Sequence, residues 1–239
     1  MTAKRLKLVV STGAGISAES GISTFRDADG LWENHNVMDV ASADGFARNP
    51  ALVHQFYNER RAALAAVEPN DAHRILRRLE EYFDVYVITQ NVDDLHERAG
   101  SSNITHLHGE LTKVRALDDE SRVWKIGYHE TTTPDTVIDG HHVRPHIVFF
   151  QEAVPMFERA TELAAQADIF VIIGTSLVVY PAAALVQYVP RTSPVYYIDP
   201  RPSRVPDGVT VIRENATTGM AELERILIDK YIKDESIKH

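Results

Sequence analysis

Residues 7–26 read KLVVSTGAGISAESGISTFR, in which a short apolar run opens into a glycine-containing loop. Leu8, Val9 and Val10 form a run typical of a buried strand. Gly13, Gly15 and Ala18 follow at the spacing of a dinucleotide-binding loop, which predicts a tight turn, close approach of backbone N–H groups to a pyrophosphate, and a small residue where the next helix packs. An ordinary turn between a strand and a helix explains the same glycines, so the loop alone does not decide the function.

The composition favours a cytoplasmic enzyme or binding protein. The 239 residues suffice for one substantial domain, or for one domain with a smaller insertion. A formal net charge of −9 argues against nucleic acid as a partner. The chain has no cysteine, which excludes disulfides, thiol nucleophiles and thiolate zinc sites. No signal peptide and no apolar stretch of membrane-spanning length is visible, so we expect no membrane partner, and we expect a monomer.

Short apolar runs predict the strands of a parallel sheet that is buried on both faces. They lie at residues 6–10, 85–89, 169–174 and 195–198. Helical patterns between them predict helices at residues 51–67, 72–83, 157–167 and 181–188, with Asn70 capping the second. This alternation indicates an α/β protein with a Rossmann-like, doubly wound parallel sheet. Residues 29–67 and 112–144 interrupt the alternation, and we expect them to form a smaller inserted domain beside a ligand cleft.

Polar side chains follow the second predicted strand directly, where an α/β fold exposes its site. They are Gln90, Asn91 and Asp93, although an ordinary loop also explains such residues. Further along, His106 and His108 alternate around Leu107, so we expect them to share a strand face. Taken by itself, a histidine here is more often a buried, hydrogen-bonded core residue than a catalytic one.

With these residues in place, the sequence resembles the sirtuins, the NAD-dependent protein lysine deacylases. The matching motifs are GAGIS (13–17), TFR (24–26), TQNVDDLH (89–96), HG (108–109), RPHIVFF (144–150) and GTSLVVYPAA (174–183). They occur in the family's order and span nearly the whole chain. The resemblance implies an NAD-binding Rossmann-like domain of residues 1–28, 84–111 and 145–239, a helical module with the cofactor loop at 29–83, and a zinc-less remnant of the family's small-domain zinc module at 112–144.

The resemblance also implies which residues bind NAD. They would be Gly13, Ala14, Gly15, Ser17, Phe25, Arg26, Gln90, Asn91, Asp93, Gly174, Thr175, Ser176, Asp199 and Ala216. Phe25 and Arg26 would belong to a loop that closes over the nicotinamide ribose and excludes water from a reactive intermediate. Asp93 would hold the nicotinamide amide, and Ser176 and Asp199 would contact the adenosine ribose.

In the implied reaction, the carbonyl oxygen of an acyl-lysine attacks the anomeric carbon of the nicotinamide ribose, and nicotinamide leaves. His108 would then act as general base on a ribose hydroxyl, and Asn91 would orient the ribose or a water. Histidine suits this work because its ordinary pKa of about 6.5 lies near working pH. His106 and His73 keep a structural interpretation.

The implied substrate is an acyl-lysine protein or peptide bound in an extended slot. Residues 148–150 and 177–179 follow strands whose edges could pair with a peptide backbone, and Val148 would meet the lysine amide. Phe149 and Phe150 are either core aromatics or part of the lysine tunnel, and the sequence leaves this open. Within the predicted helix, Tyr57 and Arg60 share a face.

The pattern of Tyr57 and Arg60 resembles that of sirtuins that remove succinyl and malonyl groups. A guanidinium fork and a phenol suit a terminal carboxylate, whereas a solvated helix face with weak pairs among Glu59, Arg60 and Arg61 is the alternative. Val37 falls where this subgroup usually has alanine, which predicts a narrower pocket and retained deacetylation.

Several residues depart from the family pattern. The region of the zinc-binding cysteines has none, so we predict no metal. His129, His141, His142 and nearby acids leave a histidine and carboxylate site as the alternative, although their spacing is not that of a recognised ligand set. We expect a module packed around apolar residues, with two of its short runs paired as a hairpin: Val123, Trp124, Ile126, Tyr128, Val137 and Ile138. Gln151 replaces a glycine that is common after the two phenylalanines. Asp199 and Pro200 stand where the family often has asparagine followed by another residue.

Three other functions stay open. An ADP-ribosyltransferase or NAD glycohydrolase would share the cofactor site, but Tyr57, Arg60 and a peptide slot disfavour it. A non-catalytic NAD-sensing module would need the glycine loop but not His108. A histidine-based metallohydrolase is disfavoured because HExxH-type spacing is absent.

Overall fold

The computed structural model describes residues 5–23, 31–32, 35–202 and 205–233. Its centre is a six-stranded parallel sheet in the order β12-β11-β10-β1-β4-β5. The strands are β1 (Lys7–Thr12), β4 (Asp84–Thr89), β5 (Ile104–His106), β10 (Ile169–Ile173), β11 (Val195–Ile198) and β12 (Val209–Ile212). The order reverses between β1 and β10, which is the strand order of a doubly wound Rossmann-like sheet. The predicted fold class is therefore confirmed.

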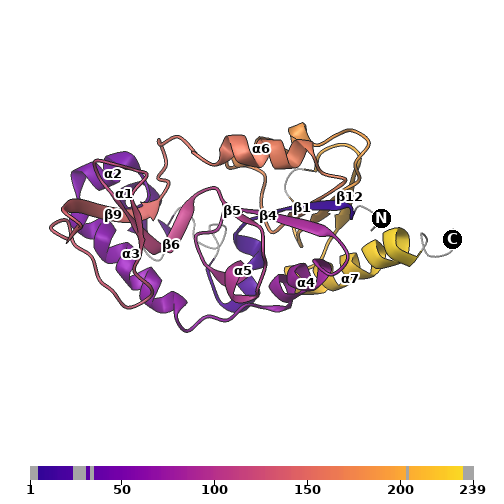
Figure 1. The fold of residues 1–239 in the computed structure, drawn as a ribbon, viewed down its shortest axis with the longest axis horizontal. Coiled ribbons are helices and arrows are strands. Elements are labelled where there is room, and N and C mark those ends of the chain that lie inside the picture. The colour runs from indigo at the N-terminus through magenta and orange to yellow at the C-terminus, as the bar shows by residue number, and fades with distance from the viewer. Residues whose placement is uncertain (1–4, 24–30, 33–34, 203–204, 234–239) are drawn as a thin grey trace.

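Helices cover both faces of this sheet (Figure 1). One face packs against α4 (Asp71–Leu79) and α7 (Ala216–Ile228) around fully buried residues of β1 and β10. The other face packs against α6 (Phe157–Ala165) and the 3₁₀ helix η4 (Ala182–Tyr188). Because the central strands are buried on both sides, they consist of continuous apolar runs. Within the described ranges, no helix combines the length and apolar character that crossing a bilayer requires.

A smaller part of the molecule lies at the end away from both termini (Figure 1). It holds helices α1 (Val37–Val40), α2 (Ala43–Arg48) and α3 (Pro50–Leu64), beside an antiparallel sheet in the order β7-β6-β9-β8. Those strands are β6 (Gly109–Ala116), β7 (Val123–Lys125), β8 (Val137–Ile138) and β9 (His141–Ile147). The remaining elements are β2 (Leu31–Trp32), β3 (His35–Asn36), α5 (Leu95–Arg98), the 3₁₀ turns η1 (Ala14–Ile16) and η2 (Ala18–Ser20), and a π-helical turn, η5 (Asp229–Lys233). The smaller inserted domain expected from the sequence is present.

The sequence predicts the long elements better than the short ones. α3 begins where Asn49 accepts a bond from the Leu52 N–H at 3.1 Å and Pro50 occupies the first turn, and Asn70 caps α4 as expected. The edge strand β12 was not predicted, because it is short and partly exposed. The strand expected around His106 and His108 is present as β5, but it ends at His106. α7 was missed although its buried residues have helical spacing: Ala216, Gly219, Met220, Leu223 and Leu227.

The predicted hairpin within residues 112–144 is wrong. β7 pairs with β6 and β8 pairs with β9, so the two short strands lie on opposite edges of the sheet. Val123 and Val137 are 38% and 50% exposed, and the buried positions are instead on the long central strands, including Val114 and Val143. The short edge strands β7 and β8 carry too little apolar surface to form the interior of this sheet.

Buried polar contacts join α3 to the loop that precedes β8. The Nε and Nη2 atoms of Arg61 donate to the Glu130 carbonyl at 3.2 and 2.6 Å, and Arg61 is fully buried. Asn58 donates to the Thr132 carbonyl at 2.8 Å. The His54 ring contacts the Thr132 hydroxyl at 2.8 Å. Arg61 is therefore a structural joint, and the alternative of weak surface pairs is wrong for this residue.

The helix α4 belongs to the core of the parallel sheet. Ile75, Leu76 and Leu79 pack in one cluster with Leu8 of β1 and Val85 of β4. The expected division groups residues 29–83 in one helical module, whereas this packing places the last part of that range against the sheet.

The loop after β1 differs from the predicted dinucleotide loop in two ways. Two 3₁₀ turns, η1 and η2, follow in place of an α-helix, and Ala18 is exposed rather than packed on the strand. The Gly15 N–H donates to the Gly174 carbonyl at 2.8 Å, and a Cβ on Gly15 would lie 2.5 Å from the Gly174 Cα. Gly15 is therefore required by the contact between two loops.

This contact predicts a selective effect of adding one methyl group. Gly174 has φ +60° and its added Cβ would lie 2.5 Å from the Ile16 nitrogen, whereas Gly208 has φ +77° and its added Cβ would meet no atom of the described residues within 4 Å. Gly174→Ala should therefore lower the free energy of unfolding by about 1–3 kcal/mol more than Gly208→Ala, since only the first overpacks. Urea unfolding measures both variants. Equal losses would show that the backbone angle, and not the loop contact, requires glycine.

Candidate active site

A cavity of about 870 Å³ lies where β1, β4, β10 and β11 end. Every predicted site residue in the described ranges lines it: Gly13, Ala14, Gly15, Ser17, Tyr57, Arg60, Gln90, Asn91, Asp93, His108, Val148, Phe149, Gly174, Thr175, Ser176, Asp199 and Ala216. Phe25 and Arg26 lie outside the described residues. The fold thus brings together side chains that are up to about 200 positions apart in the chain.

A buried polar network joins the glycine loop to the loop after β4. The Asn91 amide donates from Nδ2 to the Ser17 hydroxyl at 3.1 Å, and that hydroxyl donates to Asp93 Oδ2 at 2.9 Å. Asp93 Oδ1 accepts from the Leu95 N–H at 3.1 Å. Because Asp93 is almost fully buried, its pKa is raised above the usual value, although its two hydrogen bonds act in the opposite direction.

The His108 ring is oriented by the same loop. Its Nδ1 lies 3.0 Å from the Gln90 carbonyl oxygen. A carbonyl only accepts, so Nδ1 carries the proton and the neutral ring has its lone pair at Nε2. Burial lowers the pKa of His108, against the effect of that hydrogen bond. β5 ends at His106 and a bend follows, so His108 lies just beyond the strand on which the sequence analysis placed both histidines.

The far side of the cavity is built by the loops after β10 and β11. Thr175 accepts a bond at its hydroxyl from Gln90 Nε2 at 3.2 Å, and its carbonyl accepts from the Tyr197 hydroxyl at 2.7 Å. Asp199 is buried, and its Oδ1 accepts from the Arg201 N–H at 2.8 Å. These bonds fix the strand ends at which the sequence analysis placed cofactor contacts.

An aromatic group from α3 and the segment after β9 forms the other end of the cavity. The rings of Tyr57 and Phe149 lie 5.9 Å apart, and Phe56 meets Tyr57 edge-on at 5.2 Å. The Arg60 guanidinium lies over the Phe56 ring at 5.6 Å. Burial raises the pKa of Tyr57, so its hydroxyl stays protonated throughout the physiological range. The cavity here offers a phenol, a guanidinium and apolar walls.

Phe149 is held from behind by an ion pair. Arg144 lies over the Phe149 ring at 3.9 Å and donates to Glu152 Oε1 at 2.6 Å, while Glu152 Oε2 accepts from the Phe149 N–H at 2.8 Å. Phe149 is 2% exposed and Phe150 is 42% exposed. Phe149 is therefore a buried wall of the cavity, whereas Phe150 lines the cavity with a largely exposed side chain.

The segment around Val148 is already paired in part. Its N–H donates to the His108 carbonyl at 2.9 Å, and both backbone groups of Phe150 bind residues 41 and 43. The carbonyl of Val148 has no partner among the described residues. Fewer backbone groups of residues 148–150 are therefore available to pair with a peptide than the sequence predicted.

The predicted narrowing of the pocket by Val37 is wrong. Val37 starts α1 and packs against the core beside α3, and it does not line the cavity. Ala41, at the end of α1, does line it.

The comparisons with known proteins agree on one family. Residues 13–181 match the family model described as the Sir2 family. The chain belongs to the Sir2 family. It is 54% identical to an "NAD-dependent protein deacylase" of Bacteroides thetaiotaomicron, over 92% of this chain and 97% of the relative, and 50% identical to one of Helicobacter pylori, over 93% and 97%. The predicted family and enzyme class are confirmed.

Solved Sir2 structures share the whole fold. A Sir2 homologue mutant in complex with ADP-ribose superimposes with a TM-score of 0.86 at 36% identity, covering 95% of this chain and 94% of that one. A Sir2 homologue in complex with NAD gives 0.84 at 36% identity, covering 95% and 91%. The predicted cofactor is confirmed as well.

The residues of this Sir2 chain fit NAD. The cavity lies where the strand order reverses, which is where Rossmann-like sheets bind dinucleotides. Asn215 and Ala216 at the start of α7 line it, and the partial positive charge of a helix N-terminus favours anionic groups. Asn215 and Arg201 also line the cavity and were not predicted. Asn215 precedes α7, which was not predicted, and Arg201 lies in the loop after β11.

The residue directly after the motif RPHIVFF has a strained backbone. Gln151, where glycine is common in the family, has φ +77°. Its side chain binds Asp44 twice, accepting from the Asp44 N–H at 3.1 Å and donating to Asp44 Oδ2 at 2.7 Å. These bonds hold the left-handed backbone that would otherwise favour glycine.

This geometry predicts an order of stability. Gln151→Ala loses both bonds and keeps the strain, whereas Gln151→Gly loses the bonds but relieves the strain. Gln151→Gly should therefore be more stable than Gln151→Ala by about 1 kcal/mol, measured by urea unfolding. If the two variants unfold alike, the positive φ carries no strain here.

Proposed function

We propose that this Sir2-family enzyme is an NAD-dependent lysine deacylase for acyl-lysine proteins or peptides, that it transfers the acyl group to ADP-ribose with release of nicotinamide, and that it prefers acidic acyl groups. Desuccinylation and demalonylation are the main activities, and deacetylation is a slower one. The acyl preference rests on one observation: Tyr57 and Arg60 line the same cavity as His108.

NAD would be held by the two glycine loops and the buried network around them. Ser17, Asn91 and Asp93 would face the nicotinamide end, with Gln90 beside them, and Ser176, Asp199 and Ala216 the adenosine end. When bound, NAD supplies an activated ribosyl carbon with nicotinamide as its leaving group.

His108 is the proposed general base. With Nδ1 committed to the Gln90 carbonyl, Nε2 is the atom that accepts a proton from a hydroxyl in the cavity. The lowered pKa of His108 keeps this atom unprotonated at neutral pH. Asn91, fixed through Ser17, would orient the group that gives up the proton.

The acyl end of the cavity suits a carboxylate. The guanidinium of Arg60 gives a two-pronged donor, and the phenol of Tyr57 gives one more. The apolar rings of Phe56 and Phe149 exclude water from this end of the cavity. A neutral acetyl group cannot bind the two donors there, so it gains less binding energy than a charged succinyl group does.

The acyl preference is tested by Arg60→Met, compared with Tyr57→Phe. We expect Arg60→Met to lower kcat/KM on succinyl-lysine peptide by on the order of 10- to 100-fold, because a charged hydrogen bond is lost, and to change acetyl-lysine turnover much less. Tyr57→Phe should have a smaller effect of the same selectivity. Mass spectrometry of the acyl-ADP-ribose product follows each reaction. Equal loss on both peptides would refute the pocket assignment, and ADP-ribosylated protein as the product would favour the transferase alternative.

The base assignment predicts the acid limb of the pH profile. A base works when it is unprotonated, and the pKa of His108 is lowered from 6.5, so the acid limb of kcat/KM should rise with pH through a value below 6.5. His108→Tyr should reduce turnover by about 10²–10⁴-fold with NAD binding retained. Turnover unchanged in this variant, with folding and NAD affinity intact, would remove His108 from the mechanism.

A further inference from the structure

His106, which the proposed reaction does not use, contacts the backbone of a site residue. It ends β5, and its Nδ1 lies 3.2 Å from the Asn91 carbonyl oxygen. Two positions on, His108 makes the same kind of bond to the Gln90 carbonyl at 3.0 Å. Two imidazoles thus hold two consecutive carbonyls of the loop that carries Gln90, Asn91 and Asp93.

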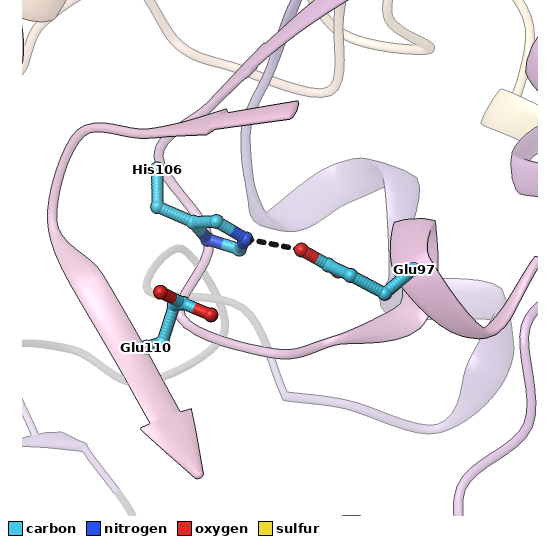
Figure 2. A group of neighbouring side chains, drawn as sticks. All are labelled: Glu97, His106 and Glu110. Atoms are coloured by element: carbon cyan, nitrogen blue, oxygen red, sulfur yellow. Dashed lines mark hydrogen bonds and ion pairs between the residues drawn. The ribbon is translucent and has the colours of Figure 1, made fainter. Parts of the chain in front are cut away.

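The other nitrogen of His106 faces a carboxylate, as Figure 2 shows. Nε2 lies 2.7 Å from Glu97 Oε1 on α5. Since Nδ1 must donate to a carbonyl, a neutral ring would present a lone pair at Nε2 to another acceptor. The contact is attractive only with a proton between the two atoms, which makes it an imidazolium–carboxylate pair.

The surroundings of His106 carry both signs of charge. Glu97 comes from α5, and Glu110 and Lys113 come from β6, where Lys113 binds Glu110. Asp93 lies in the loop after β4, and its pKa responds to the charge of His106. His96 on α5 and His146 on β9 are also near enough to sense His106, and the pKa of each is lowered by burial.

We infer that His106, as an imidazolium held by Glu97, is a positioning residue that fixes the Asn91 peptide and so the catalytic loop. The inference rests on the proposed function of Asn91 and His108. It follows from geometry, because the amide of Asn91 reaches Ser17 at 3.1 Å only while its backbone stays in place. Neither His106 nor Glu97 lines the cavity, so both act through Asn91.

A metal ion is the rival occupant of this cluster. Ligand atoms of Glu97, His106 and Glu110 lie within 4.8 Å of one another. Two ligands about 2.1 Å from a zinc ion in tetrahedral geometry are more than about 3 Å apart, which exceeds the 2.7 Å between Nε2 and Oε1. Lys113 also neutralises Glu110. The distances therefore favour a proton.

The sign of the pH effect follows from this arrangement. Burial acts to lower the pKa of His106, but the hydrogen bond and charge of Glu97, with the charge of Glu110, raise it above 6.5. The contribution of such a group is fully present below its ordinary pKa and is lost as pH rises through the raised pKa. The alkaline limb of kcat should therefore report His106.

The test compares Glu97→Gln with Glu68→Gln, another carboxylate that pairs with α5, through Arg98. Glu97→Gln should move the alkaline limb about one pH unit toward acid, because an opposite charge is removed, with KM for NAD nearly unchanged. Glu68→Gln should leave the limb in place. His106→Asn keeps a neutral donor for the Asn91 carbonyl, so its kcat should lose the alkaline limb, whereas His106→Leu should lower kcat at every pH.

NMR titration of the His106 ring in the wild-type protein and in Glu97→Gln reads the same pair without any turnover, so it separates failure of this inference from failure of the proposed function. A His106 pKa at or below 6.5 in the wild type, or an alkaline limb that Glu97→Gln does not move, would overturn the inference. So would one tightly held metal ion that His106→Leu releases.

Discussion

The contact between the loop after β1 and the loop after β10 determines the rest of the site. Parallel strands end about 4.8 Å apart, so two loops can cross there only where side chains are missing. Gly15 and Gly174 meet this condition, and the Gly15 N–H binds the Gly174 carbonyl at 2.8 Å. The crossing places Ser17 against Asn91 and Asp93, and Thr175 against Gln90. The polar network is thus a consequence of backbone packing.

The histidines of this chain divide by environment. His54, His73 and His146 are desolvated, and their pKa values fall to about 4, while that of His96 falls well below its ordinary value. These rings are neutral at physiological pH and serve as packed hydrogen-bonding groups, as His73 does in the capping box of α4. His106 differs because its Nε2 atom contacts the carboxylate of Glu97. One residue type therefore has two roles, set by the nearest charged group.

Strands buried on both faces are what the sequence predicts best, since such strands consist of continuous apolar runs, as β1 and β10 do. Site residues at strand ends follow from the same rule, and the family motifs add their identities. The 3₁₀ turns after β1 could not be predicted, because they depend on Gly174, about 160 residues away. The placement of Ala41 rather than Val37 at the cavity likewise depends on how α1 packs on α3. Long-range packing, which leaves no local pattern, accounts for these differences.

The buried guanidinium of Arg61 gives the joint between α3 and the antiparallel sheet a particular durability. It donates to a backbone carbonyl, which has no charge to lose, and an arginine keeps its own proton under all conditions in which proteins fold. Acidity changes that switch imidazoles and carboxylates in the cleft therefore leave the bonds of Arg61 to the Glu130 carbonyl intact. The contact that joins α3 to the antiparallel sheet and the titratable side chains in the cleft therefore respond differently to a change of pH.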